Sequence, residues 1–138
     1  MKVYQSGVAT HEWLVSTARK GKVTPKGAWT AKWLSKNHKS SRYNNAPMPY
    51  SIFYNGNFAV HGTDQVDRLG SPASAGCIRL HPKNAAVLFA LVNAAGLKNT
   101  TISVVNLIIN FRLFLTYFLV IFSGQIVTGK LFHVFASQ

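Results

Sequence analysis

Residues 50–62 read YSIFYNGNFAVHG, and this segment constrains the fold more than any other part of the chain. Two apolar runs in it flank the dipeptide Asn55-Gly56. Asn-Gly between apolar runs is the strongest short signal for a β-hairpin, because the tight turn needs two residues that tolerate positive φ. The second run ends at Val60, so we expect His61 where a strand gives way to a loop. The segment therefore predicts two antiparallel strands with a histidine at the end of the second.

Strand patterns also dominate the rest of the first 105 residues. Strands are expected at KVY near the start, in VATHEWLVST, in GAWTAKWL and in TTISVV, with a loop at RKGKVTPKG. The polar, proline-bearing stretch of residues 36–49 predicts a long loop, and loops of that length are often functional. One helix is expected at HPKNAAVLFALVNAAG, with Pro82 in its first turn and Gly96 at its end. Its apolar stripe at helical spacing consists of Val87, Leu88, Leu91 and Val92.

The last third of the chain has a different character. The segment NLIINFRLFLTYFLVIF, residues 106–122, is almost wholly apolar apart from Arg112, a few amides and a hydroxyl. It is shorter than the about 20 apolar residues that a bilayer span needs, and an arginine near its centre is costly there. The open interpretations are a buried helix, a pair of core strands, a membrane-interface segment, or sequence with no selected fold. We expect one domain over residues 1–105 and an apolar tail of uncertain structure and unknown role over residues 106–138.

Basic residues dominate the charge of the chain. Fifteen Lys and Arg residues oppose three acidic ones, which gives a formal net charge of +12, and eight of the fifteen lie between Arg19 and Arg42. Such an excess predicts attraction to an anionic partner, which can be a nucleic acid, a membrane surface or a cell-wall polymer. No recognised nucleic-acid motif accompanies the charge, so we predict no nucleic-acid partner. The start, MKVYQSGVATHEW, lacks the apolar core of a signal peptide and reads like the inside of a β-domain, so a domain truncated at its N-terminus is expected.

Cys77 is the only cysteine, and it lies between Gly76 and Arg79 in the segment SPASAGCIRL. A thiol reacts as its thiolate, and a nearby cation or histidine base increases the supply of thiolate. Arg79 shares a face with Cys77 in an extended chain, and Gly76 permits a bend whose backbone N–H groups can polarise a carbonyl oxygen. His61 is the best placed base. Against a catalytic role, a lone cysteine is most often a small buried hydrophobic residue. By count, four other histidines are equally available: His11, His38, His81 and His133.

Two separated stretches resemble the active-site signature of the L,D-transpeptidase (YkuD) catalytic domain family. They are VHGT at residues 60–63 and SAGCIRL at residues 74–80. TPKGAW and NNAPMPYSIFYNG resemble further stretches of the family in the same order, and the likeness covers roughly residues 1–105. One position departs, because Ala75 stands where the family often has a histidine; that position varies among members. The resemblance implies a mainly β, β-sandwich-like L,D-transpeptidase catalytic fold with one helix after the catalytic motif.

Carried over to this sequence, the resemblance implies that Cys77 is the nucleophile and His61 its proton acceptor and donor. A backbone carbonyl, expected in the segment 62–63, steadies the histidine. The neighbouring motif positions that shape the site and contact the substrate are Ser74, Gly76 and Arg79. The resemblance implies neither a metal nor an organic cofactor.

The implied reaction is acyl transfer on peptidoglycan stem peptides in the cell envelope or periplasm. A thioester acyl-enzyme forms, and an amine of a neighbouring stem converts it into an L,D cross-link. Three alternatives stay open. The same chemistry can use another acceptor, as in an L,D-carboxypeptidase or in D-amino-acid exchange; the chain can be a truncated, non-catalytic remnant of the family; or it can be a basic nucleic-acid-binding module. Association of the basic segment with a membrane or cell-wall surface is a further expectation.

Overall fold

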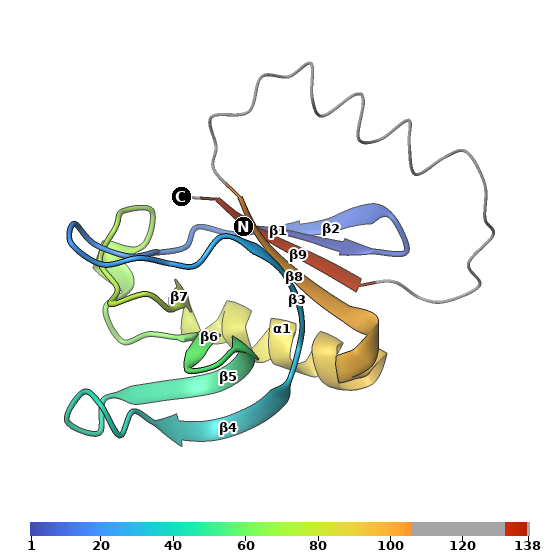
Figure 1. Ribbon diagram of the computed structural model, residues 1–138. Coiled ribbons are helices and arrows are strands. Elements are labelled where there is room, and N and C mark those ends of the chain that lie inside the picture. The colour runs from blue at the N-terminus through green and yellow to red at the C-terminus, as the bar shows by residue number, and fades with distance from the viewer. Residues whose placement is uncertain (106–131, 138) are drawn as a thin grey trace, which may run out of the picture.

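Two β-sheets and one helix make up the part of the chain that the computed structural model describes, residues 1–105 and 132–137 (Figure 1). The strands are β1 (Lys2–Gln5), β2 (Val8–Glu12), β3 (Gly27–Thr30), β4 (Trp33–Lys39), β5 (Pro47–Asn55), β6 (Phe58–Gly62), β7 (Ile78–Leu80), β8 (Thr100–Val105) and β9 (Phe132–Ser137). Helix α1 (Pro82–Ala95) follows β7, and the two short 3-10 turns are η1 (Val66–Arg68) and η2 (Leu97–Asn99). The predicted mainly β fold, with one helix after the cysteine motif, is confirmed in these residues.

The first sheet has the strand order β2-β1-β9-β8-β3, and the second sheet has the order β4-β5-β6-β7. In the second sheet, β5 and β6 form the antiparallel hairpin predicted from Asn55-Gly56, and Gly56 has a φ of 52° in its turn. β4 pairs antiparallel with β5, whereas β7 pairs parallel with β6. Side chains alternate between the two faces of this sheet, so one face enters the core and the other carries the candidate site.

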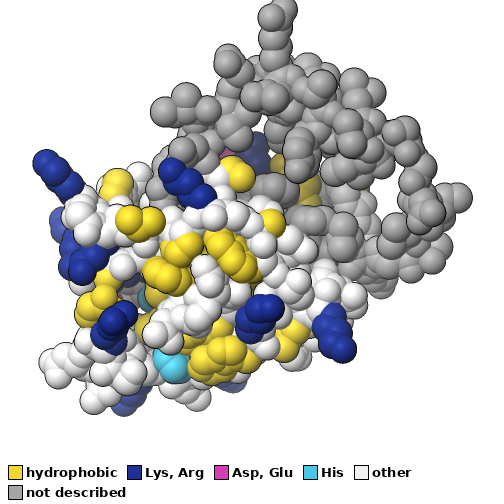
Figure 2. All heavy atoms as spheres, viewed as in Figure 1, with side chains coloured by type: hydrophobic (Ala, Val, Ile, Leu, Met, Phe, Trp, Pro, Cys, Tyr) yellow, Lys and Arg dark blue, Asp and Glu magenta, His cyan; other side chains and the backbone are white. Residues whose placement is uncertain are grey.

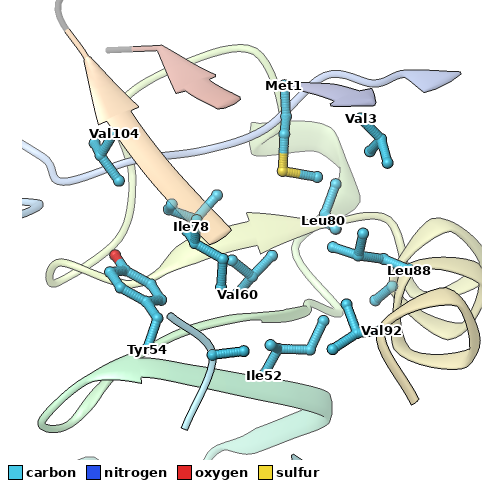
Figure 3. Close-up of a cluster of buried hydrophobic side chains, with 13 residues drawn as sticks. Met1, Val3, Ile52, Tyr54, Val60, Ile78, Leu80, Leu88, Val92 and Val104 are labelled. Carbon is cyan, nitrogen blue, oxygen red and sulfur yellow. The ribbon is translucent and has the colours of Figure 1, made fainter. Parts of the chain in front are cut away.

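One cluster of buried apolar side chains joins both sheets and the helix (Figure 3). Its largest contribution comes from the second sheet, through Ile52, Tyr54, Val60, Ile78 and Leu80. The first sheet and the helix add Val3, Ile102, Val104, Ala85, Leu88 and Val92. Burying a side chain of this size stabilises the fold by about 1.5–3 kcal/mol relative to leaving it exposed. The shared core therefore fixes the second sheet against α1 and the first sheet.

Helix α1 begins at Pro82, as predicted, and His81 caps it. The Nδ1 atom of His81 accepts a hydrogen bond of 3.2 Å from the backbone N–H of Lys83. The predicted apolar stripe is only partly right, because Val87 is 42% exposed. Leu88 faces the core, and Val87, the preceding residue, lies about 100° away around the helix and therefore points toward solvent. The buried side chains of the helix are Ala85, Leu88 and Val92.

The long loop expected over residues 36–49 is right only for its middle part and wrong at both ends. β4 continues to Lys39 and β5 begins at Pro47, so only residues 40–46 connect the two strands. Pro47 and Pro49 have a paired strand, β4, on one side only, because β6 pairs with β5 from Ile52 onward. No hydrogen bond to β6 is therefore lost where these prolines lack an amide hydrogen. Lysines and prolines are common both in loops and at sheet edges, so the polar composition of this stretch did not distinguish a loop from edge strands.

Tyr50 interrupts the regular alternation of β5, because its φ is 56°. Positive φ is uncommon for a tyrosine. The ring of Tyr50 packs against Phe89 of α1, with the ring centroids 5.8 Å apart. Met48 would share that face in a regular strand, but it packs instead with Phe53 and Ala59 on the opposite face. The unusual backbone of Tyr50 thus turns the start of β5 toward the face that carries the candidate site.

The C-terminal strand β9 lies between β1 and β8 in the first sheet. It pairs antiparallel with β1 and parallel with β8. The predictions for the apolar segment 106–122 concern residues outside the described part of the chain. Among the residues that the structure describes, no helix is long and apolar enough to cross a membrane.

Candidate active site

Strands β6 and β7 place the predicted site residues side by side. Their parallel register pairs His61 with Arg79, and it pairs Val60 with Ile78. Val60 and Ile78 face the core, so His61 and Arg79 point to the opposite face. Cys77 immediately precedes β7 and packs against the apolar side chains of that same opposite face. The structure therefore brings His61, Cys77 and Arg79 to one face of the second sheet, which we call the site face.

His61 is buried, with 5% of its surface exposed, and its ring has a fixed orientation. Nδ1 lies 2.7 Å from the carbonyl oxygen of Gly62. A carbonyl only accepts hydrogen bonds, so Nδ1 carries the proton and donates, and Nε2 of the neutral ring is an acceptor. This is the carbonyl contact that the family resemblance predicted for segment 62–63, and its presence is confirmed. The imidazole is thereby held in the tautomer that a general base requires.

Burial keeps the His61 ring neutral. Loss of solvent lowers its pKa from the usual 6.5 to about 4, and the positive charge of Arg79 and the nearby His38 act in the same direction. The hydrogen bond to Gly62 opposes this change but is outweighed. His38 was one of the equally available histidines in the sequence, and the structure places it close enough to influence His61. A neutral imidazole at physiological pH can accept a proton.

The thiol of Cys77 is also held in its neutral form. It is half-buried, and burial raises its pKa above the ordinary value. The backbone N–H of Ala59 and the charge of Arg79 lower the pKa but do not offset the burial. Arg79 thus acts in the predicted direction, toward the thiolate, without producing one by itself. The site thus contains a neutral thiol and a neutral imidazole, and a thiolate forms there only if a base removes the thiol proton.

The turn before Cys77 is built from buried backbone contacts. Ser74 is fully buried, and its Oγ accepts a hydrogen bond of 3.0 Å from the Gly76 N–H. Gly76 has a φ of 138°, and a Cβ there would lie 2.5 Å from the ring of Phe58 and 2.9 Å from the carbonyl oxygen of Val23. The buried Ser74 side chain therefore stabilises the turn. The sequence suggested the Gly76 N–H as a donor to a substrate carbonyl oxygen, but in the structure this N–H already donates to Ser74.

Two residues, Thr17 and Gln65, make hydrogen bonds in this region that could not be predicted from the sequence. The carbonyl of Thr17 accepts hydrogen bonds from the N–H groups of Ala73 and Ser74, both 2.9 Å long. Gln65 accepts a hydrogen bond of 2.8 Å through its Oε1 from Nη1 of Arg79, and it thereby restrains the guanidinium. Thr17 acts through its backbone, which any residue has. Gln65 follows the histidine by four positions in a polar loop, and that proximity is the only clue to its contact.

The other histidines lie elsewhere or serve other contacts. His11 packs against Trp13 at the first sheet, with ring centroids 4.8 Å apart, and His81 caps α1. His133 falls in β9, of which only the backbone is described. The described residues contain no cluster of three or more His, Cys, Asp or Glu side chains that could hold a metal ion. Of the histidines whose side chains are described, His61 is the one paired across the β6–β7 ladder with Arg79, two residues from Cys77.

The comparisons with known proteins identify a family and a shared fold. The family model for the L,D-transpeptidase catalytic domain, YkuD, matches residues 1–106. The solved structure of the L,D-transpeptidase LdtMt1 in complex with imipenem is similar, with a TM-score of 0.57 and 23% identity over 62% of this chain and 46% of that one. An L,D-transpeptidase from Mycobacterium smegmatis has a TM-score of 0.56 and 23% identity, over 62% of this chain and 46% of that one. The L,D-transpeptidase (Yku) from Stackebrandtia nassauensis has a TM-score of 0.50 and 28% identity, over 55% of this chain and 37% of that one.

Likeness at about this identity establishes a shared fold. The chain spans less than half the length of these three solved proteins. No curated protein matches the chain.

Proposed function

Because the chain belongs to the L,D-transpeptidase catalytic domain family, we propose that it is a cysteine acyltransferase acting on peptidoglycan stem peptides. The product is an L,D cross-link formed through a thioester acyl-enzyme. The observation that carries this proposal is the geometry of His61, whose Nδ1 is held by Gly62 and whose ring shares the site face with Cys77. A nucleophile, a base and a group that orients the base are the three parts that such chemistry needs.

The first half of the reaction releases D-alanine. The sulfur of Cys77 attacks the carbonyl carbon before the terminal D-alanine of a stem tetrapeptide, while Nε2 of His61 takes the thiol proton. The tetrahedral intermediate then collapses, the carbon–nitrogen bond breaks, and His61 returns the proton to the leaving amine. A thioester between Cys77 and the shortened stem remains.

The second half forms the cross-link. The amine of a neighbouring stem attacks the thioester carbonyl, and His61 accepts a proton from the attacking nitrogen. The carbon–sulfur bond breaks, and the proton passes to the sulfur, which restores the neutral pair. The charge of Arg79 favours the sulfur anion during both halves, because it lowers the pKa of Cys77. We assign Arg79 to the substrate and the developing charge, and Ser74 and Gly76 to the backbone that presents Cys77.

We further propose that residues 1–105 are the catalytic unit and that the tail, residues 106–138, has another role. The second sheet, which carries the site face, contains no residue of the described tail strand β9. Lys and Arg side chains stand at several places on the face shown in Figure 2, with exposed apolar side chains between them. This positive surface supports a location at an anionic cell wall or membrane surface in the cell envelope.

The decisive experiment measures D-alanine release from purified stem tetrapeptides. We expect wild-type protein to release D-alanine and to form tetrapeptide–tripeptide dimers. Cys77→Ala should abolish release, and His61→Ala should reduce it by about 10²- to 10⁴-fold, the usual value of general acid–base catalysis. His11→Ala is the matched control and should leave the rate unchanged, because His11 lies at the first sheet.

The products separate the alternatives. Tripeptide without dimer would indicate a carboxypeptidase, and incorporation of an added D-amino acid would indicate exchange. The similar protein LdtMt1 was solved in complex with imipenem, so imipenem is a second probe of the thiol. A cooperatively folded chain that neither releases D-alanine nor gains the mass of imipenem at Cys77 would be a non-catalytic remnant.

A further inference from the structure

A row of side chains crosses the site face from Cys77 to the edge of the second sheet. The cross-strand partners Trp33 and Phe53 connect β4 with β5, and Phe53 pairs in turn with Ala59 of β6. Ala59 and Cys77 each precede a paired residue of the parallel β6–β7 ladder, so they continue the row. Met48 packs beside this row. The thiol is therefore linked to Trp33 by a continuous line of neighbouring positions on one face.

Three rings at the far end of the row form what we call the aromatic shelf: Trp33, His38 and Phe53. The rings of Trp33 and Phe53 are stacked with an interplanar angle of 1° and centroids 3.9 Å apart. His38 meets both rings edge-on, at 5.6 Å from Trp33 and 4.9 Å from Phe53. Phe53 is 4% exposed, whereas Trp33 is 43% exposed. The indole is thus held rigidly by its neighbours while much of its surface remains open to a ligand.

The surroundings of Trp33 favour a small amphipathic ring over an apolar protein partner. Its neighbours on β4 and in the preceding turn, Lys32, Lys36 and Asn37, are exposed and polar. Protein interfaces are marked by larger continuous apolar patches. A sugar ring instead has one face of C–H groups, which packs on an aromatic ring, and a rim of hydroxyls, which polar side chains and water can bind.

The spacing fits the donor substrate. Three inter-strand steps of about 4.8 Å place the Trp33 position about 14 Å from the Cys77 position. Three residues of a stem tetrapeptide precede the bond that Cys77 attacks, and they span about 10 Å when extended. The sugar that carries the stem then begins within reach of the shelf. On the basis of the proposed function, we propose that Trp33 is a carbohydrate-binding subsite that holds the glycan sugar of the donor stem.

The experiment compares a disaccharide tetrapeptide with the free tetrapeptide. Calorimetric titration uses Cys77→Ala protein, in which neither ligand is consumed, and the disaccharide alone is the third ligand. We expect the sugar-bearing ligand to bind about five- to tenfold more tightly, in line with an aromatic contact of about 1 kcal/mol. Adding Trp33→Leu should remove this difference and leave the affinity for free tetrapeptide unchanged. Trp33→Phe, which retains an aromatic face, should preserve part of it.

Val87→Ala is the control, since Val87 is exposed to the same degree on α1, which packs against the opposite face of the second sheet. Equal affinities of the Cys77→Ala protein for the disaccharide tetrapeptide and the free tetrapeptide would overturn the subsite. An equal loss of affinity for both ligands on adding Trp33→Leu would also overturn it. D-alanine release from free tetrapeptide by wild-type protein, with no preference for the sugar, would refute the subsite and support the proposed function. Binding of the disaccharide without binding or turnover of the tetrapeptide would support the subsite and refute the proposed function. Failure to bind any of the three ligands would refute the subsite.

Discussion

The two faces of the second sheet use the same strands for opposite purposes. On the core face, Val60 and Ile78 are fully buried among apolar side chains. One residue away along each strand, His61 and Cys77 lie on the site face and carry polar, titratable groups. The core face stabilises the fold, whereas the site face keeps a histidine and a thiol partly removed from water at a cost visible in their displaced pKa values.

The core face fixes the geometry of the site face. Side chains alternate with a period of two, so a slip of one residue in the β6–β7 pairing would exchange the two faces. Val60 and Ile78 prevent the slip, because exposing them would lose the stabilisation from apolar burial. His61 and Cys77 are therefore held on the same face of neighbouring strands by residues of the core.

The largest difference between the faces should appear when adjacent residues are truncated. Ile78→Ala removes a fully buried side chain from the core and should lower the free energy of unfolding by about 2–5 kcal/mol. Cys77→Ala, one residue earlier, should lower it by less than about 1 kcal/mol while it abolishes acyl transfer. Urea unfolding of both variants at pH 7 measures the contrast. Equal losses of stability would mean that Cys77 is mainly a packing residue.

The pH dependence of stability should report the burial of His61. Its pKa is about 4 in the folded chain and 6.5 when exposed, so below pH 6.5 the unfolded chain binds a proton that the folded chain refuses. The stabilisation is complete above pH 6.5 and should fall by about 3 kcal/mol as the pH decreases toward 4. Urea unfolding between pH 7.5 and pH 4 measures this slope.

His61→Asn should flatten that slope, and His11→Asn, at the first sheet, should leave it as in the wild type. Only three acidic residues are present, so carboxylates contribute little background to the measurement. An unchanged slope in His61→Asn would contradict the burial of a neutral imidazole.

Arg79 should affect the chemistry of the site face more than the stability of the fold. Arg79→Ala should lower kcat/KM about tenfold, a loss of about 1.4 kcal/mol of transition-state stabilisation. Because its charge lowers the pKa of His61, the acidic limb of the pH–rate profile should move to higher pH in this variant. Gln65→Ala keeps the charge and removes only the restraint, so it should have the smaller effect. If the thermal melt collapses while activity per folded molecule is unchanged, Arg79 is structural.

The smallest expected effect concerns a polar group on the core face. The hydroxyl of Tyr54 is buried in the core and has no hydrogen-bond partner among the described residues. Tyr54→Phe should therefore raise the free energy of unfolding by about 1 kcal/mol, since an unpaired buried hydroxyl is unfavourable. Tyr43→Phe, at an exposed position of the β4–β5 connection, is the control and should change nothing. A destabilised Tyr54→Phe variant would reveal a partner for that hydroxyl.

Local sequence is sufficient to predict the features that depend on residues adjacent along the chain. Asn55-Gly56 set the hairpin turn because few residues tolerate its backbone angles, and Pro82 and Gly96 marked the helix. The spaced motifs around His61 and Cys77 are enough to indicate the family, which the family model confirms. These signals are local, so a single segment contains all the information they need.

Tertiary structure alone decided what depends on contacts distant along the chain. Both ends of the loop predicted over residues 36–49 belong to paired strands, because their backbone groups have partners across the sheet. The restraint of Arg79 by Gln65 and the position of β9 between β1 and β8 had no local signature. The neutral state of His61 likewise follows from exclusion of water by surrounding elements. Register and desolvation are properties of packed neighbours, so they exist only once the sheets have assembled.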